Sequence, residues 1–258
     1  MGIRSPTTRR QRATTLLRLP TGKKLRWMCR LNGARLNSPS LKLTGGGESA
    51  KTVSLERGTK LEIATTDYTF SGGTLNATGT GAIDVTSAIA TFSGTSGSAN
   101  LKVSGTGTAK ISGSHSTTGR LTLSSGKIDA TSNTSTATVA GFDWTGGDVT
   151  TAIVNSSDST ISSTGSKKLY GGAKLNLSGA TAWSGGDLST GGGAEINNSG
   201  TFTASFDGNI TKGEGGEATF KNSGSFIKSN ATSGTTDVQT ALTNTGTVTA
   251  SAGTLKFS

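Results

Sequence analysis

The sequence has few of the residues that most folded chains use to hold themselves together. Among 258 residues there are one cysteine, three prolines and one histidine, and aromatic residues make up 5% of the chain. The single Cys29 excludes an internal disulfide, and we expect it to be an unreactive thiol. Apolar residues reach only 31%, which is too little for an ordinary globular core.

Long apolar runs are also missing. No segment reaches the roughly 18 apolar residues of a membrane span, and no apolar stretch of about 7–15 residues follows the basic start as a secretory signal requires. Glycine, with 39 residues, and abundant Ser and Thr take their place. Two kinds of chain have this composition: disordered low-complexity segments, and repetitive β structures whose narrow cores need few apolar residues per turn.

The net charge of +10 comes from one end of the chain. Residues 1–40 contain ten basic side chains, no acidic one and all three prolines, whereas residues 41–258 contain 15 basic and 15 acidic side chains. This change near Ser40 predicts that residues 1–40 form a disordered basic head. A misplaced, non-native start of the sequence would produce the same change in composition. A head of this charge could bind nucleic acid, which we keep as one alternative function.

From Leu41 onward the sequence predicts strands and turns and no helix. Apolar residues occupy every second position of short runs such as "TVSLERGTKLEIA" and "RLTLSSGKIDA", the period of a strand with one buried face. Gly, Asn, Asp and Ser interrupt these runs every six to ten residues, as turns require.

A repeated frame in the last third of the chain indicates the architecture. Segments 196–202, 220–226 and 242–248 align without a gap as apolar, any, Asn, hydroxyl, Gly, hydroxyl, apolar. Their asparagines recur along the sequence with a step of 24 and then one of 22, a period typical of solenoids. We therefore predict an all-β fold, a right-handed parallel β-helix or β-solenoid. It would form about nine coils over residues 41–258 and continue beyond them.

The invariant positions of the frame have predicted structural roles. The asparagines are expected to stack their amides from coil to coil and to adopt the left-handed conformation at a corner. The glycines are expected to let the chain turn into the next strand. The residues concerned are Asn198, Asn222 and Asn244, with Gly200, Gly224 and Gly246.

A second phrase, an aromatic residue followed by a hydroxyl and two glycines, occurs at Phe70, Trp144 and Trp183. We interpret these aromatics as inward-facing or rim packing residues that precede a turn. Their steps of 74 and then 39 suggest a longer repeat. That repeat agrees with a period of 22–24 only if coils vary in length or contain inserted loops. The register is therefore left open over residues 76–140.

The phrases "FDWTGGDV", "AWSGGDLSTGGG", "INNSGTFTAS", "FKNSGSF" and "LTNTGTVTASAGTLKFS" resemble repeats of filamentous-haemagglutinin-like and autotransporter-type bacterial adhesins. The resemblance extends from Leu41 to Ser258. It implies a β-helical passenger region, export to the cell surface, a role in attachment or as a stalk, and no cofactor. The given sequence starts without a signal peptide or secretion domain, so we expect a segment of a longer exported protein.

Two aspartates could supply the paired carboxylates of a polysaccharide-active enzyme. Asp148 and Asp187 follow the two glycines in two copies of the aromatic phrase, so they could approach each other on one face. Glycoside hydrolysis uses carboxyl groups about 5–9 Å apart. In the Phe70 copy the equivalent residue is Thr74, and an aspartate at this place also suits a turn. We therefore expect no enzyme and keep this one as an alternative.

The remaining candidates give weaker signals. His115 lies in the polar segment "SGSHSTTG", where we expect an exposed loop residue without a catalytic role. There is no Cys/His cluster, so neither a metal nor a cofactor is predicted. Alternating threonines in 134–138 and 243–249 could array hydroxyls on a flat strand, as ice- or glycan-contacting surfaces do, or reflect β-propensity alone.

These observations favour a structural and adhesive segment of a bacterial cell-surface or secreted protein. Its outer faces, rich in Thr, Ser and Asn, would bind a glycan or protein on a host or neighbouring cell. Exposed ends of the solenoid would also allow self-association, because open strand edges pair with further strands.

Overall fold

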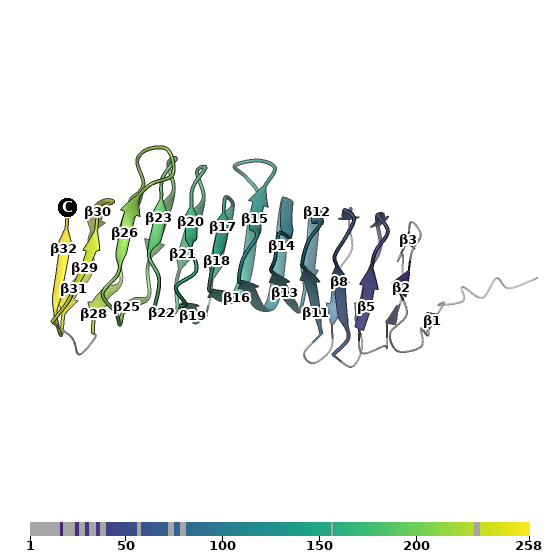
Figure 1. Cartoon of the computed structure of the whole chain (residues 1–258), viewed down its shortest axis with the longest axis horizontal. Coiled ribbons are helices and arrows are strands. Elements are labelled where there is room, and N and C mark those ends of the chain that lie inside the picture. The colour runs from purple at the N-terminus through teal and green to yellow at the C-terminus, as the bar shows by residue number, and fades with distance from the viewer. Residues whose placement is uncertain are drawn as a thin grey trace, which may run out of the picture.

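The chain forms an elongated rod in which short strands lie side by side from one end to the other (Figure 1). This computed structural model describes residues 16–17, 24–25, 29–30, 35–36, 40–55, 58–71, 75–77, 81–155, 157–229 and 233–258. For those before residue 40, and for 75–77 and 154–155, it describes the backbone alone. The described residues form strands and turns, and among them no helix could cross a membrane.

The strand pairings define three faces, each a column of parallel strands one coil apart. Face 1 consists of β2 (Lys24–Leu25), β5 (Ser40–Leu43), β8 (Lys60–Ile63), β11 (Ala82–Val85), β13 (Asn100–Val103), the ends of β14 (Thr108–Leu123) and β16 (Thr136–Trp144), β19 (Ser159–Ile161), β22 (Ala180–Trp183), β25 (Thr201–Ala204), β28 (Ser225–Lys228) and β31 (Thr247–Ala250).

The other two faces are built in the same way. Face 2 consists of β3 (Cys29–Arg30), β6 (Gly47–Ser49), β9 (Tyr68–Phe70), the starts of β12 (Ile89–Ser98) and β14, β15 (Lys127–Ala130), β17 (Gly147–Val149), β20 (Lys167–Leu169), β23 (Leu188–Thr190), β26 (Asn209–Lys212), β29 (Thr235–Val238) and β32 (Thr254–Phe257). Face 3 contains two paired columns. The first consists of β1 (Leu16–Leu17), β4 (Arg35–Leu36), β7 (Val53–Leu55) and β10 (Leu75–Ala77). The second consists of the end of β12, the middle of β14, the start of β16, β18 (Ala152–Asn155), β21 (Lys174–Leu177), β24 (Glu195–Asn198), β27 (Thr219–Asn222) and β30 (Ala241–Asn244).

The coils differ in length. Ten steps along face 1 lead from Leu41 to Val248. The shortest of these steps along the sequence leads from Phe142 to Ser159, and the longest leads from Phe202 to Phe226. The prediction of an all-β parallel solenoid is confirmed, with about ten turns; its right-handed sense stays a prediction.

The aromatic phrase marks a corner at the end of face 1. Trp144 and Trp183 are fully buried, and their indole N–H groups donate to the carbonyls of Gly147 at 3.1 Å and Gly186 at 2.9 Å. Both glycines have a positive φ, 89° and 70°, that favours glycine. Trp144 pairs with Ile161, and Ile161 pairs with Trp183. The sequence step from Trp144 to Trp183 is therefore two coils of unequal length.

A narrow apolar core runs along the described solenoid, because inward residues alternate with outward ones in every face. Aromatic rings reinforce it: Phe70 and Phe92 stack with centroids 5.2 Å apart, and Phe202, Phe220 and Phe226 contact one another at 5.2–5.5 Å. Phe70 ends β9 on face 2, so the first copy of the aromatic phrase occupies a different corner from the two tryptophans.

The glycines of the frame are required for a different reason than the sequence predicts. Gly200, Gly224 and Gly246 do not have a positive φ. A Cβ on each would overlap the carbonyl oxygen of the glycine at the same corner of the preceding coil, so close backbone approach selects glycine here. The predicted left-handed asparagines are wrong as well. Among the described residues, Ser163 is the one non-glycine with a positive φ, 69°.

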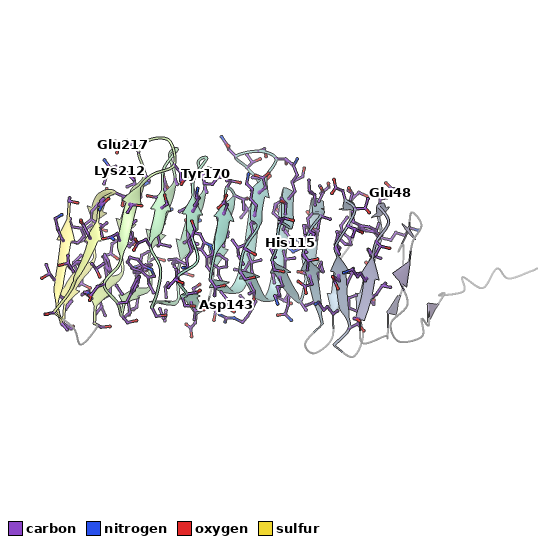
Figure 2. The ribbon with its side chains drawn as sticks, in the orientation of Figure 1. Glu48, His115, Asp143, Tyr170, Lys212 and Glu217 are labelled. Carbon is purple, nitrogen blue, oxygen red and sulfur yellow. The ribbon has the colours of Figure 1, made fainter. Side chains whose placement is uncertain are left out.

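His115 is not the exposed loop residue that the sequence predicts. It lies in β14 on face 3, is 1% exposed and belongs to the core (Figure 2). Its Nδ1 lies 2.9 Å from Ser96 Oγ, its Nε2 lies 3.1 Å from Ser98 Oγ, and its ring centroid is 4.4 Å from that of Phe92. Both nitrogens of a neutral imidazole are thus satisfied, and burial lowers the pKa of His115 to about 4.

We expect the stability of the fold to fall between pH 7 and pH 5 because of His115. Its folded-state pKa of about 4 lies below the ordinary 6.5, so the unfolded chain binds the proton first and stability is lost as the pH falls from 6.5 to 4. Linkage gives a loss of about 2 kcal/mol between pH 7 and pH 5. Urea denaturation measures it, with H115F as the variant that lacks the proton site. An imidazole that titrates above pH 6 in the folded protein would contradict the prediction.

Most of residues 1–40 lie outside the described residues. Within them, the two-residue strands β1 to β4 are described, and they pair in parallel with one another or with the first coils. The side chain of Cys29 is not among the described groups. The disordered head, its native status and its binding of nucleic acid therefore stay predictions.

Candidate functional site

The repeated frame places its asparagines at the ends of the face 3 strands. Asn198 and Asn222 are 1% exposed, and the amides stack: Asn198 Nδ2 donates to Asn222 Oδ1, and Asn222 Nδ2 donates to Asn244 Oδ1, both at 2.7 Å. Each Nδ2 also donates to a backbone carbonyl of the following coil: Asn198 to that of Ser225 at 3.0 Å, and Asn222 to that of Thr247 at 2.9 Å. This inner ladder ties neighbouring coils together at the corner between face 3 and face 1.

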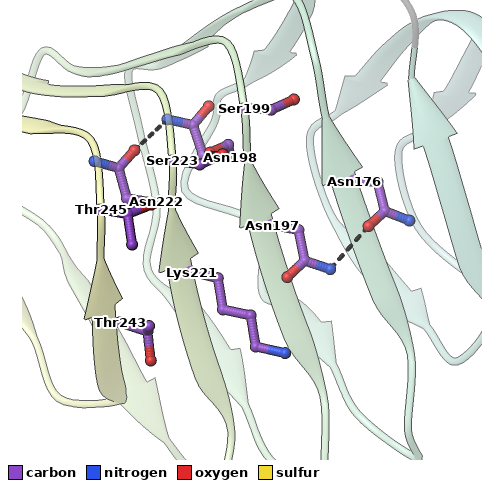
Figure 3. A pocket seen from close by; sticks show the side chains of 9 residues that line it. All are labelled: Asn176, Asn197, Asn198, Ser199, Lys221, Asn222, Ser223, Thr243 and Thr245. Carbon is purple, nitrogen blue, oxygen red and sulfur yellow. Dashed lines mark hydrogen bonds between the residues drawn. The ribbon is translucent and has the colours of Figure 1, made fainter.

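The variable position of the frame forms an outward row on the same strands. Asn176, Asn197, Lys221 and Thr243 are register partners in β21, β24, β27 and β30. Asn197 Nδ2 donates to Asn176 Oδ1 at 2.8 Å, in the opposite direction to the inner ladder. Figure 3 shows the consequence: the oxygen of Asn197 turns away from Asn176, toward the strand of Lys221.

The hydroxyl position of the frame supplies a row at the corner itself. Ser199, Ser223 and Thr245 are exposed there, and the two serines donate to the carbonyls of Leu177 and Asn198 at 3.3 Å. Between this row and the outward row lies an open hollow of about 380 Å³, which we call the corner hollow (Figure 3). Its lining residues are Asn176, Asn197, Asn198, Ser199, Lys221, Asn222, Ser223, Thr243 and Thr245.

An ion pair sits at the edge of the corner hollow. Lys221 Nζ lies 3.0 Å from Glu195 Oε1, and Lys174 Nζ lies 3.7 Å from Glu195 Oε2. The hydrogen bond from Lys221 lowers the pKa of Glu195, so this carboxylate is ionised at neutral pH. The other lining residues are asparagines, serines and threonines, so Lys221 is the one charged residue that lines the hollow.

The two candidate aspartates are not brought together. Asp148 lies on β17, where its register partners on the neighbouring strands are Lys127 and Lys168. Asp187 precedes β23, which is two strands further along face 2. Two strand spacings amount to about 10 Å, beyond the separation that glycoside hydrolysis uses. Asp187 accepts the backbone N–H of Asn209 at 2.8 Å, which is a structural role. The geometry gives the paired-carboxylate alternative no support.

Asp148 belongs instead to a charged cluster on face 2 that was not predicted from the sequence, next to Tyr170. Tyr170 Oη lies 3.2 Å from Asp148 Oδ2, Lys127 Nζ lies 5.8 Å from the centre of the Tyr170 ring, and Lys168 pairs with Glu214 at 3.1 Å. Burial, and then the charge of Asp148, raises the pKa of Tyr170. Lys127, Asp148 and Lys168 follow one another at nearly equal steps of one coil length, and that spacing was the available signal.

The threonine runs do not form flat arrays on single strands. Thr243 belongs to β30 on face 3, Thr247 and Thr249 belong to β31 on face 1, and Thr245 lies at the corner between them. The run 134–138 is likewise divided between a turn and β16. Rows of hydroxyls therefore run across the strands, from coil to coil, rather than along them.

No group of three or more His, Cys, Asp or Glu side chains that could hold a metal ion occurs in the part of the chain that the structure describes. No family model, curated protein or solved structure matches the chain. The candidate site therefore rests on the geometry of the repeated frame.

Proposed function

We propose that the chain is a structural and adhesive segment of a bacterial cell-surface or secreted protein. The observation that carries this proposal is the repeated frame, in which one seven-residue pattern supplies core, corner and outer surface in successive coils. A solenoid built in this way offers an extended surface instead of one deep site. The resemblance of its phrases to adhesin repeats supports export and attachment.

The outer surface supports contact with a glycan or protein on another cell. Its Thr, Ser and Asn rows repeat at one strand spacing, about 4.8 Å, so identical groups can engage a ligand many times over. Residues 41–258 carry 15 basic and 15 acidic side chains, so the contacts depend on hydrogen bonds more than on net charge. Self-association through the ends of the solenoid stays a prediction.

A bead-attachment assay tests the proposal. Beads coated with the full chain should attach to epithelial cell monolayers several times more often than albumin-coated beads of equal protein density. Periodate oxidation of the monolayer distinguishes a glycan partner, whose binding is lost, from a protein partner, whose binding persists. Attachment no greater than that of the albumin beads would contradict an adhesive role.

A further inference from the structure

We propose that the corner hollow binds an uncharged oligosaccharide that lies along the axis of the rod. This inference rests on the proposed adhesive function and names the ligand class and the site. The hollow is the place where the frame's hydroxyl row and variable row face each other across four neighbouring coils, from Asn176 to Thr243.

The free hydrogen-bonding groups of the hollow fit sugar hydroxyls. In the outward pair, Asn197 Nδ2 donates to Asn176 Oδ1, and this direction leaves Asn197 Oδ1 facing the strand of Lys221 (Figure 3). Thr243 and Thr245 add exposed hydroxyls, each both donor and acceptor. Amides and hydroxyls can pair with a ligand whose every hydroxyl both donates and accepts.

The spacing of these groups fits a chain of sugar rings. Ser199, Ser223 and Thr245 are in consecutive coils, and so are Asn197, Lys221 and Thr243, at a strand spacing of about 4.8 Å. That spacing is comparable to the length of one pyranose ring. Successive rings of an oligosaccharide running across the strands would therefore meet equivalent groups. The volume of about 380 Å³ lies within the range of small-ligand sites.

The electrostatics favour a ligand without charge. Lys221, the one charged lining residue, is paired with Glu195 at 3.0 Å. An anionic ligand would have to displace or approach that carboxylate, and a cationic ligand would meet the ammonium of Lys221. A neutral ligand leaves the pair intact and avoids the cost of desolvating an unpaired charge.

Calorimetric titration of the full chain tests the inference with three probes: cellohexaose and hexa-N-acetylchitohexaose, which are neutral, and hexagalacturonate, which is anionic. We expect at least one neutral hexasaccharide to bind. The isosteric double variant T243V/T245V should weaken that binding about tenfold or more, because it removes two hydroxyls. The control T247V/T249V removes two hydroxyls from β31, outside the hollow, and should bind as the unaltered chain does.

Three results would overturn the inference: no binding of either neutral probe, equal binding by T243V/T245V and the unaltered chain, or hexagalacturonate binding at least as tightly as the neutral probes. The bead assay separates failure of the sugar-binding inference from failure of the proposed adhesive function. If T243V/T245V beads attach as well as unaltered beads, adhesion stands and the hollow is not its site. If the hollow binds sugar but unaltered beads do not attach, the site stands and the adhesive function is wrong.

Discussion

Replacement of Gly224 by alanine is expected to destabilise the solenoid by about 3–5 kcal/mol, because the added methyl group has no room at this corner. The new Cβ would overlap the carbonyl oxygen of Gly200, which already accepts the backbone N–H of Ser225 at 2.8 Å. Relief of the overlap requires the two coils to separate. Separation would break that hydrogen bond and strain the amide contact between Asn198 and Asn222. Urea denaturation followed by circular dichroism measures the loss.

A second glycine distinguishes close approach from backbone conformation. Gly215 has φ 81°, and a Cβ there would meet no atom within 4 Å. The variant G215A should therefore lose only the conformational preference of glycine, about 1–2 kcal/mol. If G224A unfolds at the same urea concentration as the unaltered chain, or if G215A is the less stable of the two, the close-approach explanation is wrong.

Replacement of Lys167 by methionine is expected to cost about 2–4 kcal/mol. The Lys167 side chain is 1% exposed although it bears an ammonium group. Its Nζ donates to the carbonyls of Ser163 at 2.7 Å, Gly165 at 3.0 Å and Gly185 at 3.2 Å. Burial lowers the pKa of Lys167, and these three carbonyls offset the cost of burying its charge. Methionine keeps the length of the side chain but leaves all three acceptors without this donor.

The neighbouring lysine is a matched control for this variant. Lys168 points outward from the same strand and pairs with Glu214 at the surface, so K168M should change the unfolding midpoint far less than K167M does. Limited proteolysis adds a local readout. Ser163 has a positive φ within the turn that surrounds the ammonium, so loss of the three bonds should expose 162–166 to cleavage. Equal midpoints and equal cleavage in K167M and K168M would show that the ammonium does not hold this corner.

The parallel solenoid itself was predictable from local pattern. Alternation along 41–258 sets which side chains face inward, and the aligned frames at 196–202, 220–226 and 242–248 set the coil period where it is most regular. The alternation depends on neighbouring residues, and the period depends on the recurrence of one frame; both can be counted along a single sequence. For the same reason, the burial of Trp144 and Trp183 followed from the phrase that surrounds them.

Other features depend on what lies in the next coil, which is about 20 residues away in sequence but about 4.8 Å away in space. The unequal coil lengths, and hence the register in the middle of the chain, are visible only from strand pairing. His115 is buried because Ser96 and Ser98 lie beside it in the preceding coil.

The sequence by itself determined the period, the inward and outward positions and the abundance of Ser, Thr and Asn on the surface, because these follow from local alternation and from the recurrence of one motif. The tertiary structure alone decided why Gly200 and Gly224 are glycines, how Lys167 is buried and where the corner hollow lies. Each of these depends on which atom of one coil faces which atom of the next. Coils of unequal length make that correspondence impossible to count along the chain.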